Sequence, residues 1–247
     1  IPVSNNGARV RLLLYKAGLE GEVEIQSPAA LGGLKSEEYL QLHPQGKMPL
    51  LVTETGLAVP ESEVIVSYLL DKYPEETAPF VAPTVDARTR AALLTRLHDV
   101  YMCGAPPGGN TVMGGLYKPM GEDEREAKLA SMNAQLDDIE ALLADGANGG
   151  GPWLATSAAP STADFALFPS MVFVRFMAPR FFGWEDPFAV ERRPYLARWW
   201  DACMADADFA RVHGEVAGAL EGWADGGRWD KIGANEQVAA APDRYKH

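Results

Sequence analysis

The stretch HPQGKMPLLVTETGLAVPES at residues 43–62 contains two short apolar runs around a turn that ends at Gly56. Glycine supplies the backbone freedom that a tight hairpin needs. The stretch therefore predicts two short strands within 49–60. Glu61 and Ser62 stand where the apolar pattern changes to that of a helix.

Strand-like and helical patterns alternate around this hairpin over the first 76 residues. The predicted elements are the end of a strand whose beginning is missing at 1–3, a helix at 4–17, a strand at 22–26, a helix at 37–44, the hairpin, and a helix at 61–73. This order is typical of a small α/β domain with helices packed on a mixed sheet.

Strand-like patterns stop near residue 84, and helical patterns follow. Along 121–144, apolar residues recur at alternating steps of three and four, the spacing of one helical face. Ser161 and Asp164 have a capping-box arrangement, and apolar residues surround the axis of the helix that follows, so we expect that helix at the domain's centre. The predicted organisation is a domain at 1–76, a linker at 77–85, an all-helical domain at 86–222, and an extended tail at 223–247 that a partner would have to order.

The composition, with 47% apolar and 23% charged residues, is that of a soluble globular protein. No apolar run reaches the roughly 18 residues of a membrane-spanning helix, so none is expected. The net charge of −12 argues against sequence-independent binding to nucleic acid or anionic lipid, because such binding needs basic patches.

The chain contains two cysteines, Cys103 and Cys203, which are far apart and form no CxxC pair. Neither a disulfide framework nor a metal site is therefore expected, and a reducing compartment follows, either the cytoplasm or an organelle stroma. The four histidines have no metal-binding spacing and are interpreted as structural or surface residues.

Three motifs in this order resemble those of the glutathione S-transferase superfamily. They are HPQGKMPLL at 43–51, the ES pair at 61–62, and GPWLA at 151–155 followed by STADF at 161–165. The resemblance covers residues 1 to about 210. It implies a thioredoxin-like domain followed by an all-helical domain, with glutathione as co-substrate.

The resemblance also implies a glutathione site. It makes the Met48–Pro49 peptide cis, so that Met48 presents its backbone to the cysteinyl part of glutathione as a strand edge would. Glu61 and Ser62 would receive the γ-glutamyl end, and Lys47 would meet the glycyl carboxylate.

Ser4 occupies the position of the catalytic serine in the serine-type tau, zeta and related classes. A hydroxyl at a helix N-terminus can hydrogen-bond the glutathione sulfur and favour its thiolate. The alternative is that Ser4 only caps the helix. The turn SNNG contains no thiol, so disulfide reduction at this turn is not expected.

The acceptor site is less defined. Its candidates are Tyr101, Met102, Met113 and Tyr117, which lie beside or within a Gly/Pro-rich segment at 103–119 suited to a cleft-shaping loop. The alternative is that these are ordinary core or surface residues.

Three functions are compatible with this sequence. The first is a transferase that conjugates glutathione thiolate to a small electrophile, and the second is a glutathione-dependent isomerase or ether-cleaving enzyme. The third is a non-catalytic subunit of a larger assembly. The resemblance implies a homodimer, and the third function implies docking on another protein.

Overall fold

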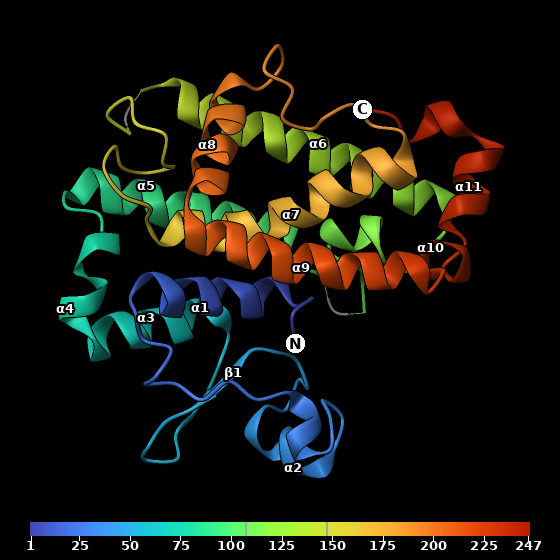
Figure 1. The fold of residues 1–247 in the computed structure, drawn as a ribbon. Helices are drawn as coiled ribbons and strands as arrows, with labels where there is room; N and C mark the ends of the chain where they lie inside the picture. Colours follow the sequence, from blue (N-terminus) through green and yellow to red (C-terminus); the bar gives the residue numbers. More distant parts are fainter. Residues whose placement is uncertain (107, 147) are drawn as a thin grey trace.

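The computed structural model of the protein describes residues 1–106, 108–146 and 148–247. A small α/β part lies below a larger helical part in Figure 1. The strands and α-helices are α1 (Asn5–Lys16), α2 (Glu37–Leu42), β1 (Leu50–Val52), β2 (Ala58–Pro60), α3 (Ser62–Lys72), α4 (Pro74–Thr77), α5 (Val85–Arg96), α6 (Glu122–Ala144), α7 (Thr162–Phe182), α8 (Pro194–Ala205), α9 (Ala207–Asp225), α10 (Arg228–Lys231) and α11 (Ala234–Ala240). Shorter 3₁₀ or π segments are η1 (Pro28–Leu31), η2 (Ala78–Phe80), η3 (Leu97–Met102), η4 (Met113–Leu116) and η5 (Pro242–Arg244).

The predicted hairpin is confirmed. β1 and β2 pair antiparallel with Leu51 opposite Val59. The turn closes through a hydrogen bond from the Gly56 N–H to the Thr53 carbonyl at 2.9 Å, and Gly56 has a φ of 81°. Glycine adopts this backbone conformation without the strain that a side chain would add.

The other two predicted strands are wrong for the described residues, whose sheet has two strands. Residues 1–3 form a turn in which the Ser4 N–H donates to the Ile1 carbonyl at 3.1 Å. Residues 22–26 consist of the end of a turn, a bend and irregular backbone, and they join no ladder. Together with β1 they line a cavity of about 460 Å³. An alternating pattern forms a strand only where a neighbour supplies hydrogen bonds, and the turn at 1–3 supplies no strand edge.

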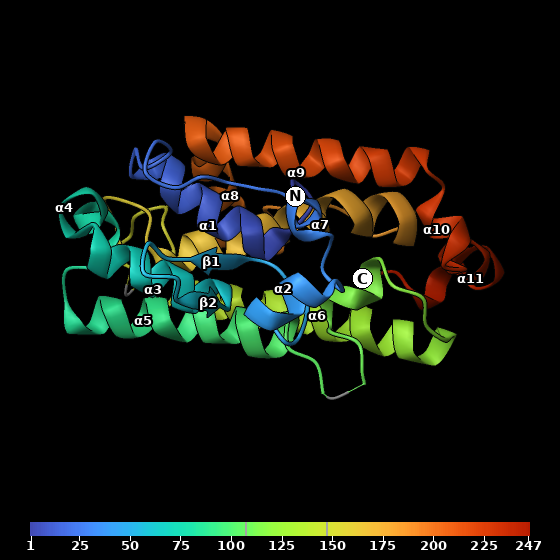
Figure 2. The same cartoon turned by 90° about the horizontal axis from the view of Figure 1, so that it is seen from below.

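Helix α1 connects the two parts of the molecule. It contacts α3 in the α/β part and α7 and α9 in the helical part (Figure 2). Leu12 and Leu13 are fully buried in these contacts. On the α9 side, the Arg11 guanidinium pairs with Glu215 at 2.9 Å. The N-terminus of α1 is therefore held by packing from both parts.

Helix α7 forms the centre of the helical part, as the sequence predicts. It begins with the expected capping box of Ser161 and Asp164 and contacts α1, α5 and α9. Among the described helices, α7 is long and apolar enough to span a membrane, but 72% of its most apolar window is buried inside the protein. Its apolar surface is therefore covered by neighbouring helices.

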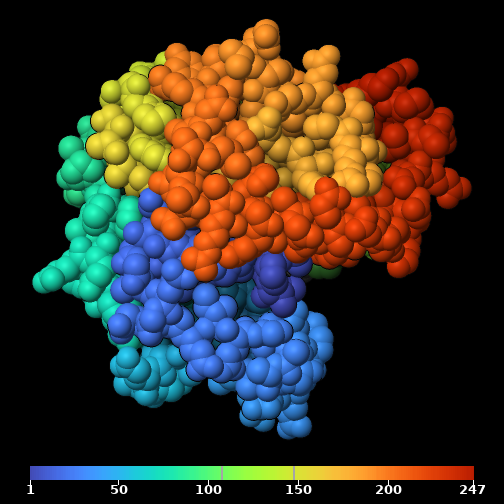
Figure 3. Space-filling view, in the orientation of Figure 1, coloured from blue at the N-terminus to red at the C-terminus, as the bar shows by residue number. Residues whose placement is uncertain are grey.

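The C-terminal segment at 223–247 is folded, and the expectation of an extended tail is wrong. It contains the end of α9, α10, α11 and η5, and Figure 3 shows it packed against the helical part (red). Trp229 is buried and donates its indole N–H to the Leu116 carbonyl at 2.9 Å. Trp184 likewise donates to the carbonyl of buried Tyr245 at 2.8 Å. These anchors are single residues without periodicity, so a search for helical patterns misses them.

Candidate functional site

Ser4 is the N-cap of α1. Its Oγ accepts a hydrogen bond from the Gly7 N–H at 3.0 Å, so Ser4 does cap this helix. A hydroxyl group both accepts and donates, so capping leaves the O–H proton of Ser4 available to a ligand. The first turn of α1 contains no acidic residue that would offset the positive field of its N-terminus. Capping and ligand binding by Ser4 are therefore compatible.

Met48 and Pro49 lie in the loop that leads into β1. The Met48–Pro49 peptide is cis, which confirms that prediction. The Tyr39 hydroxyl donates to the Lys47 carbonyl at 2.6 Å and holds the preceding turn. Ser4, Met48 and Pro49 all line the cavity of about 460 Å³, whereas the Lys47 side chain is exposed.

Glu61 and Ser62 form the start of α3. Glu61 has φ 68° and ψ 119°, and it is the only non-glycine with a positive φ among residues 1–106, 108–146 and 148–247. Such a conformation costs about 1–3 kcal/mol and is concentrated at ligand sites. Ser62 is almost fully buried, and its Oγ accepts from Arg9 Nη1 at 3.4 Å. Neither residue lines the large cavity.

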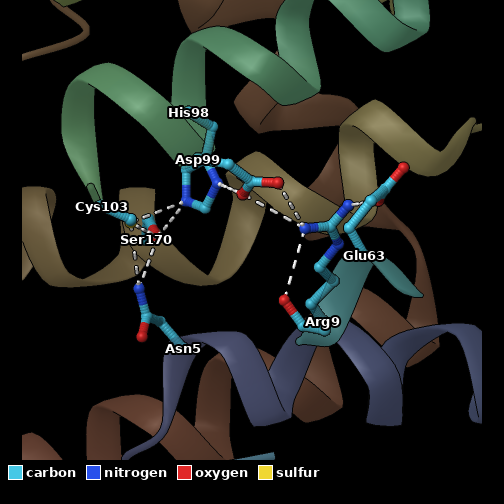
Figure 4. A network of polar contacts seen from close by, with 8 residues as sticks. Asn5, Arg9, Glu63, His98, Asp99, Cys103 and Ser170 are labelled. Carbon is cyan, nitrogen blue, oxygen red and sulfur yellow. Dashed lines mark hydrogen bonds and ion pairs between the residues drawn. The ribbon is translucent and has the colours of Figure 1, made fainter. Parts of the chain in front are cut away.

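Arg9 joins three elements beneath this helix start (Figure 4). The fully buried guanidinium contacts Ser62, forms an ion pair with Glu63, and donates to both carboxylate oxygens of Asp99 at 3.2 Å. Burial alone would raise the pKa of Asp99, but the hydrogen bond from His98 and the charge of Arg9 outweigh it and lower that pKa. The network fixes α3 relative to α1 and η3.

The predicted acceptor residues are not gathered at one site. Met102 and Met113 are buried in the hydrophobic core, so their assignment to a substrate surface is wrong. Tyr101 is exposed, and Tyr117 packs between Phe173 and Trp223, with both ring centroids at 5.7 Å.

Burial, together with the nearby charge of Cys103, raises the pKa of Tyr117 to about 12. Pro107, which belongs to the segment expected to shape the cleft, lies outside the described residues.

His98 and Cys103 form a polar cluster that the sequence analysis did not identify. The His98 imidazole is buried and contacts Asp99, Ser170 and Cys103. An α-helix would turn residues five apart to different faces, but η3 is a π-helix, in which the Cys103 N–H donates to the His98 carbonyl. The only sequence signal was a histidine followed five residues later by a cysteine.

Comparisons with known proteins agree with this architecture. Residues 1–77 match the family model of the glutathione S-transferase N-terminal domain, and residues 122–202 match that of the C-terminal domain. The glutathione S-transferase-like protein tpcF of Aspergillus fumigatus is 26% identical over 209 residues, covering 81% of this chain and 87% of tpcF. Maleylacetoacetate isomerase of Pseudomonas aeruginosa is 27% identical over 216 residues, covering 85% of this chain and 92% of the isomerase.

A solved structure has the same fold. Maleylacetoacetate isomerase of Methylobacterium extorquens, with bound malonate and glutathione, superposes with a TM-score of 0.62 at 22% identity, covering 87% of this chain and 94% of that one. The two matched models together include α1, the hairpin, α3 and the core helix α7. The chain therefore belongs to the glutathione S-transferase superfamily, with a thioredoxin-like domain followed by a helical domain.

Proposed function

We propose that this protein is a glutathione transferase that conjugates the glutathione thiolate to a small electrophile. The observation that carries the proposal is the strained backbone of Glu61 at the start of α3. A bound α-amino group would account for this conformation, because the Glu61 carboxylate would pair with it. Ser62 and the α3 N-terminus would bind the adjacent carboxylate of the γ-glutamyl group.

The reaction would take place at the N-terminus of α1. The Ser4 hydroxyl would donate to the glutathione sulfur and, with the helix N-terminus, stabilise its thiolate. The thiolate attacks the electrophilic carbon, a C–S bond forms, and the leaving group or π bond takes the electron pair. Support comes from the position of Ser4, whose Oγ accepts from Gly7 and keeps its proton free.

A glutathione-dependent isomerase is the second candidate. It is favoured by the similarity to two maleylacetoacetate isomerases, one of which was crystallised with glutathione. The same thiolate would add to an unsaturated acid and leave again after bond rotation. Assays with a generic aromatic electrophile and with a cis-unsaturated dicarboxylic acid distinguish the two activities.

We expect Glu61→Gln and Ser62→Ala each to weaken glutathione binding by about 1–3 kcal/mol, because each leaves a charged end of the ligand without its partner. Calorimetric titration with glutathione measures the loss. Ser67→Ala, an exposed serine on the same helix, is the matched control and should bind as the wild type does. Unchanged affinity in both Glu61→Gln and Ser62→Ala would exclude the α3 N-terminus from the site.

We also propose that the protein is a homodimer that uses α3 and α5. Both helices expose apolar side chains, with Val64 on α3 51% exposed and Leu93 on α5 47% exposed. Leu93→Glu is expected to convert a particle of about twice 26.7 kDa into a monomer in light scattering. Val190→Glu, at an exposed apolar residue outside both helices, should leave the dimer intact. A monomeric wild type at micromolar concentration would contradict the proposal.

A further inference from the structure

Cys103, His98 and Asp99 form a chain of polar contacts at the end of η3 (Figure 4). Cys103 Sγ lies 3.3 Å from His98 Nε2, and His98 Nδ1 lies 2.8 Å from Asp99 Oδ1. An ionised carboxylate can only accept, so Nδ1 carries a proton and Nε2 faces the sulfur. This is the order of nucleophile, base and orienting carboxylate found in enzymes that activate a thiol or hydroxyl.

Further side chains hold Cys103, His98 and Asp99 in place. Arg9 donates to both oxygens of Asp99 at 3.2 Å and fixes the carboxylate. The Ser170 hydroxyl lies 2.7 Å from His98 Nε2 and accepts from Asn5 Nδ2 at 2.8 Å. The same Asn5 amide lies 3.7 Å from Cys103 Sγ, within range of a weak hydrogen bond to sulfur. The imidazole is therefore constrained on both ring nitrogens.

Cys103 and Asp99, at the two ends of these contacts, are both partly exposed. His98 and Ser170 are fully buried, whereas Cys103 is partly exposed. The π-turn places Cys103 beside His98, and Gly104 allows the chain to bend away, since a Cβ there would meet the Val100 carbonyl oxygen at 2.4 Å. Cys103 is therefore held at a defined, partly exposed position.

The surrounding charges favour a proton on the imidazole. Burial by itself lowers the pKa of His98, but the charge of Cys103 and the hydrogen bond to Asp99 outweigh it and raise that pKa to about 9. Arg9 on α1 adds positive charge near the sulfur, and Tyr117 stays a neutral hydroxyl. The Cys103 sulfur thus faces the His98 imidazole, and the Arg9 guanidinium lies behind it on Asp99.

Asn5 Nδ2 lies 3.7 Å from Cys103 Sγ, so this sulfur is near the N-terminus of α1, where the glutathione sulfur is proposed to bind. We propose that Cys103 is a second nucleophile of the site and accepts the glutathionyl group from glutathionyl mixed disulfides. The substrate class rests on the proposed function, which places a glutathionyl group at Ser4 and the α3 N-terminus. Other disulfides would lack those contacts.

The exchange balances without an external oxidant. The Cys103 sulfur attacks the glutathionyl sulfur of R–S–S–G, a Cys103–glutathione disulfide forms, and the original S–S bond breaks. The thiolate RS⁻ leaves and takes the proton from His98. Glutathione then attacks the Cys103-bound glutathionyl sulfur, the Cys103–glutathione S–S bond breaks, and the thiol proton of the attacking glutathione returns to His98. This yields glutathione disulfide and restores Cys103. The net change is R–S–S–G plus glutathione to RSH plus glutathione disulfide.

The first test is intact-mass spectrometry after brief exposure of the full chain to glutathione disulfide at pH 7. The expected product carries one glutathionyl group per chain, located on Cys103 by peptide mapping. Cys103→Ser should remain unmodified, and Cys203→Ser should react as the wild type does, because Cys203 is fully buried. Modification that is absent in the wild type, or that persists in Cys103→Ser, would overturn the proposal.

The second test separates an activated thiol from a merely exposed one. His98→Asn is expected to slow the reaction about a hundredfold at pH 7, the size of effect typical of a positioned base. The difference should shrink at high pH, where thiols ionise without a base. Asp99→Asn should show the same trend if His98→Asn fails to fold. Equal rates for the wild type and these variants would show that His98 and Asp99 do not activate Cys103.

A neutral disulfide, 2,2′-dithiodipyridine, distinguishes the two proposals. The wild type should react with both disulfides in a His98-dependent manner, and Ser62→Ala should slow the reaction with glutathione disulfide more than the reaction with dithiodipyridine. If dithiodipyridine reacts fast in a His98-dependent manner and glutathione disulfide does not, the proposal that Cys103 takes glutathionyl disulfides is wrong. The same result counts against the glutathione site. If calorimetry nevertheless shows glutathione binding, the same result contradicts the further inference while the proposed function stands.

Discussion

Replacing Ser4 by alanine should lower the turnover number about thirty- to a thousandfold, because one donor to the reacting sulfur is worth about 2–4 kcal/mol. Glutathione affinity should change little, since Ser4 would contact the sulfur rather than the charged ends of the tripeptide. Steady-state kinetics with a generic aromatic electrophile measure the loss. Ser4→Thr keeps the hydroxyl and should retain most of the rate.

Ser4 also caps α1, so its loss should lower the free energy of unfolding by about 1 kcal/mol. Thr84→Ala is the matched control. Thr84 caps α5 in the same way, through a hydrogen bond from the Ala87 N–H, and it is exposed away from the proposed site. A similar fall in turnover for Ser4→Ala and Thr84→Ala would show that only the cap matters.

Asp164→Ala is expected to destabilise the protein by about 3 kcal/mol or more, because it leaves several buried donors without an acceptor. The carboxylate accepts from the Ser161 N–H at 2.7 Å, the Leu154 N–H at 3.0 Å and the Trp199 indole at 2.9 Å. Asp164 is fully buried at the start of the core helix α7. Burial raises the pKa of this carboxyl, and these hydrogen bonds oppose the shift.

Urea unfolding followed by circular dichroism measures this loss as a lower midpoint at unchanged slope. Asp201→Ala, at an exposed aspartate on α8, is the control. It should shift the midpoint no more than ordinary surface substitutions do. A loss below about 1 kcal/mol for Asp164→Ala would mean that water replaces the carboxylate and that the capping box is not a determinant of stability.

Features set by local chemistry could be predicted from the sequence. Gly56 and the flanking apolar runs determine the hairpin, and Ser161 with Asp164 determines the start of α7. The cis peptide at Pro49 was predicted from the resemblance and is confirmed. For the hairpin and the start of α7, residues a few positions apart carry the whole signal.

Features set by tertiary contacts could not be predicted. The alternation at 22–26 needed a neighbouring strand to become part of a sheet, and the structure places a cavity there. A methionine can line a cleft or lie in a core, and the sequence does not distinguish the two for Met102 and Met113. Packing places both in the core. The pairing of His98 with Cys103 depends on a π-turn, which leaves no periodic pattern in the sequence.

The central claim is that the protein binds glutathione as a thiolate at Ser4. The most direct measurement is the ultraviolet difference spectrum of glutathione with the Cys103→Ser protein near neutral pH, since that background contributes no signal from Cys103. We expect thiolate absorbance that free glutathione lacks at this pH. This absorbance should fall in the double variant that also carries Ser4→Ala. Saturating glutathione without thiolate absorbance would contradict the account.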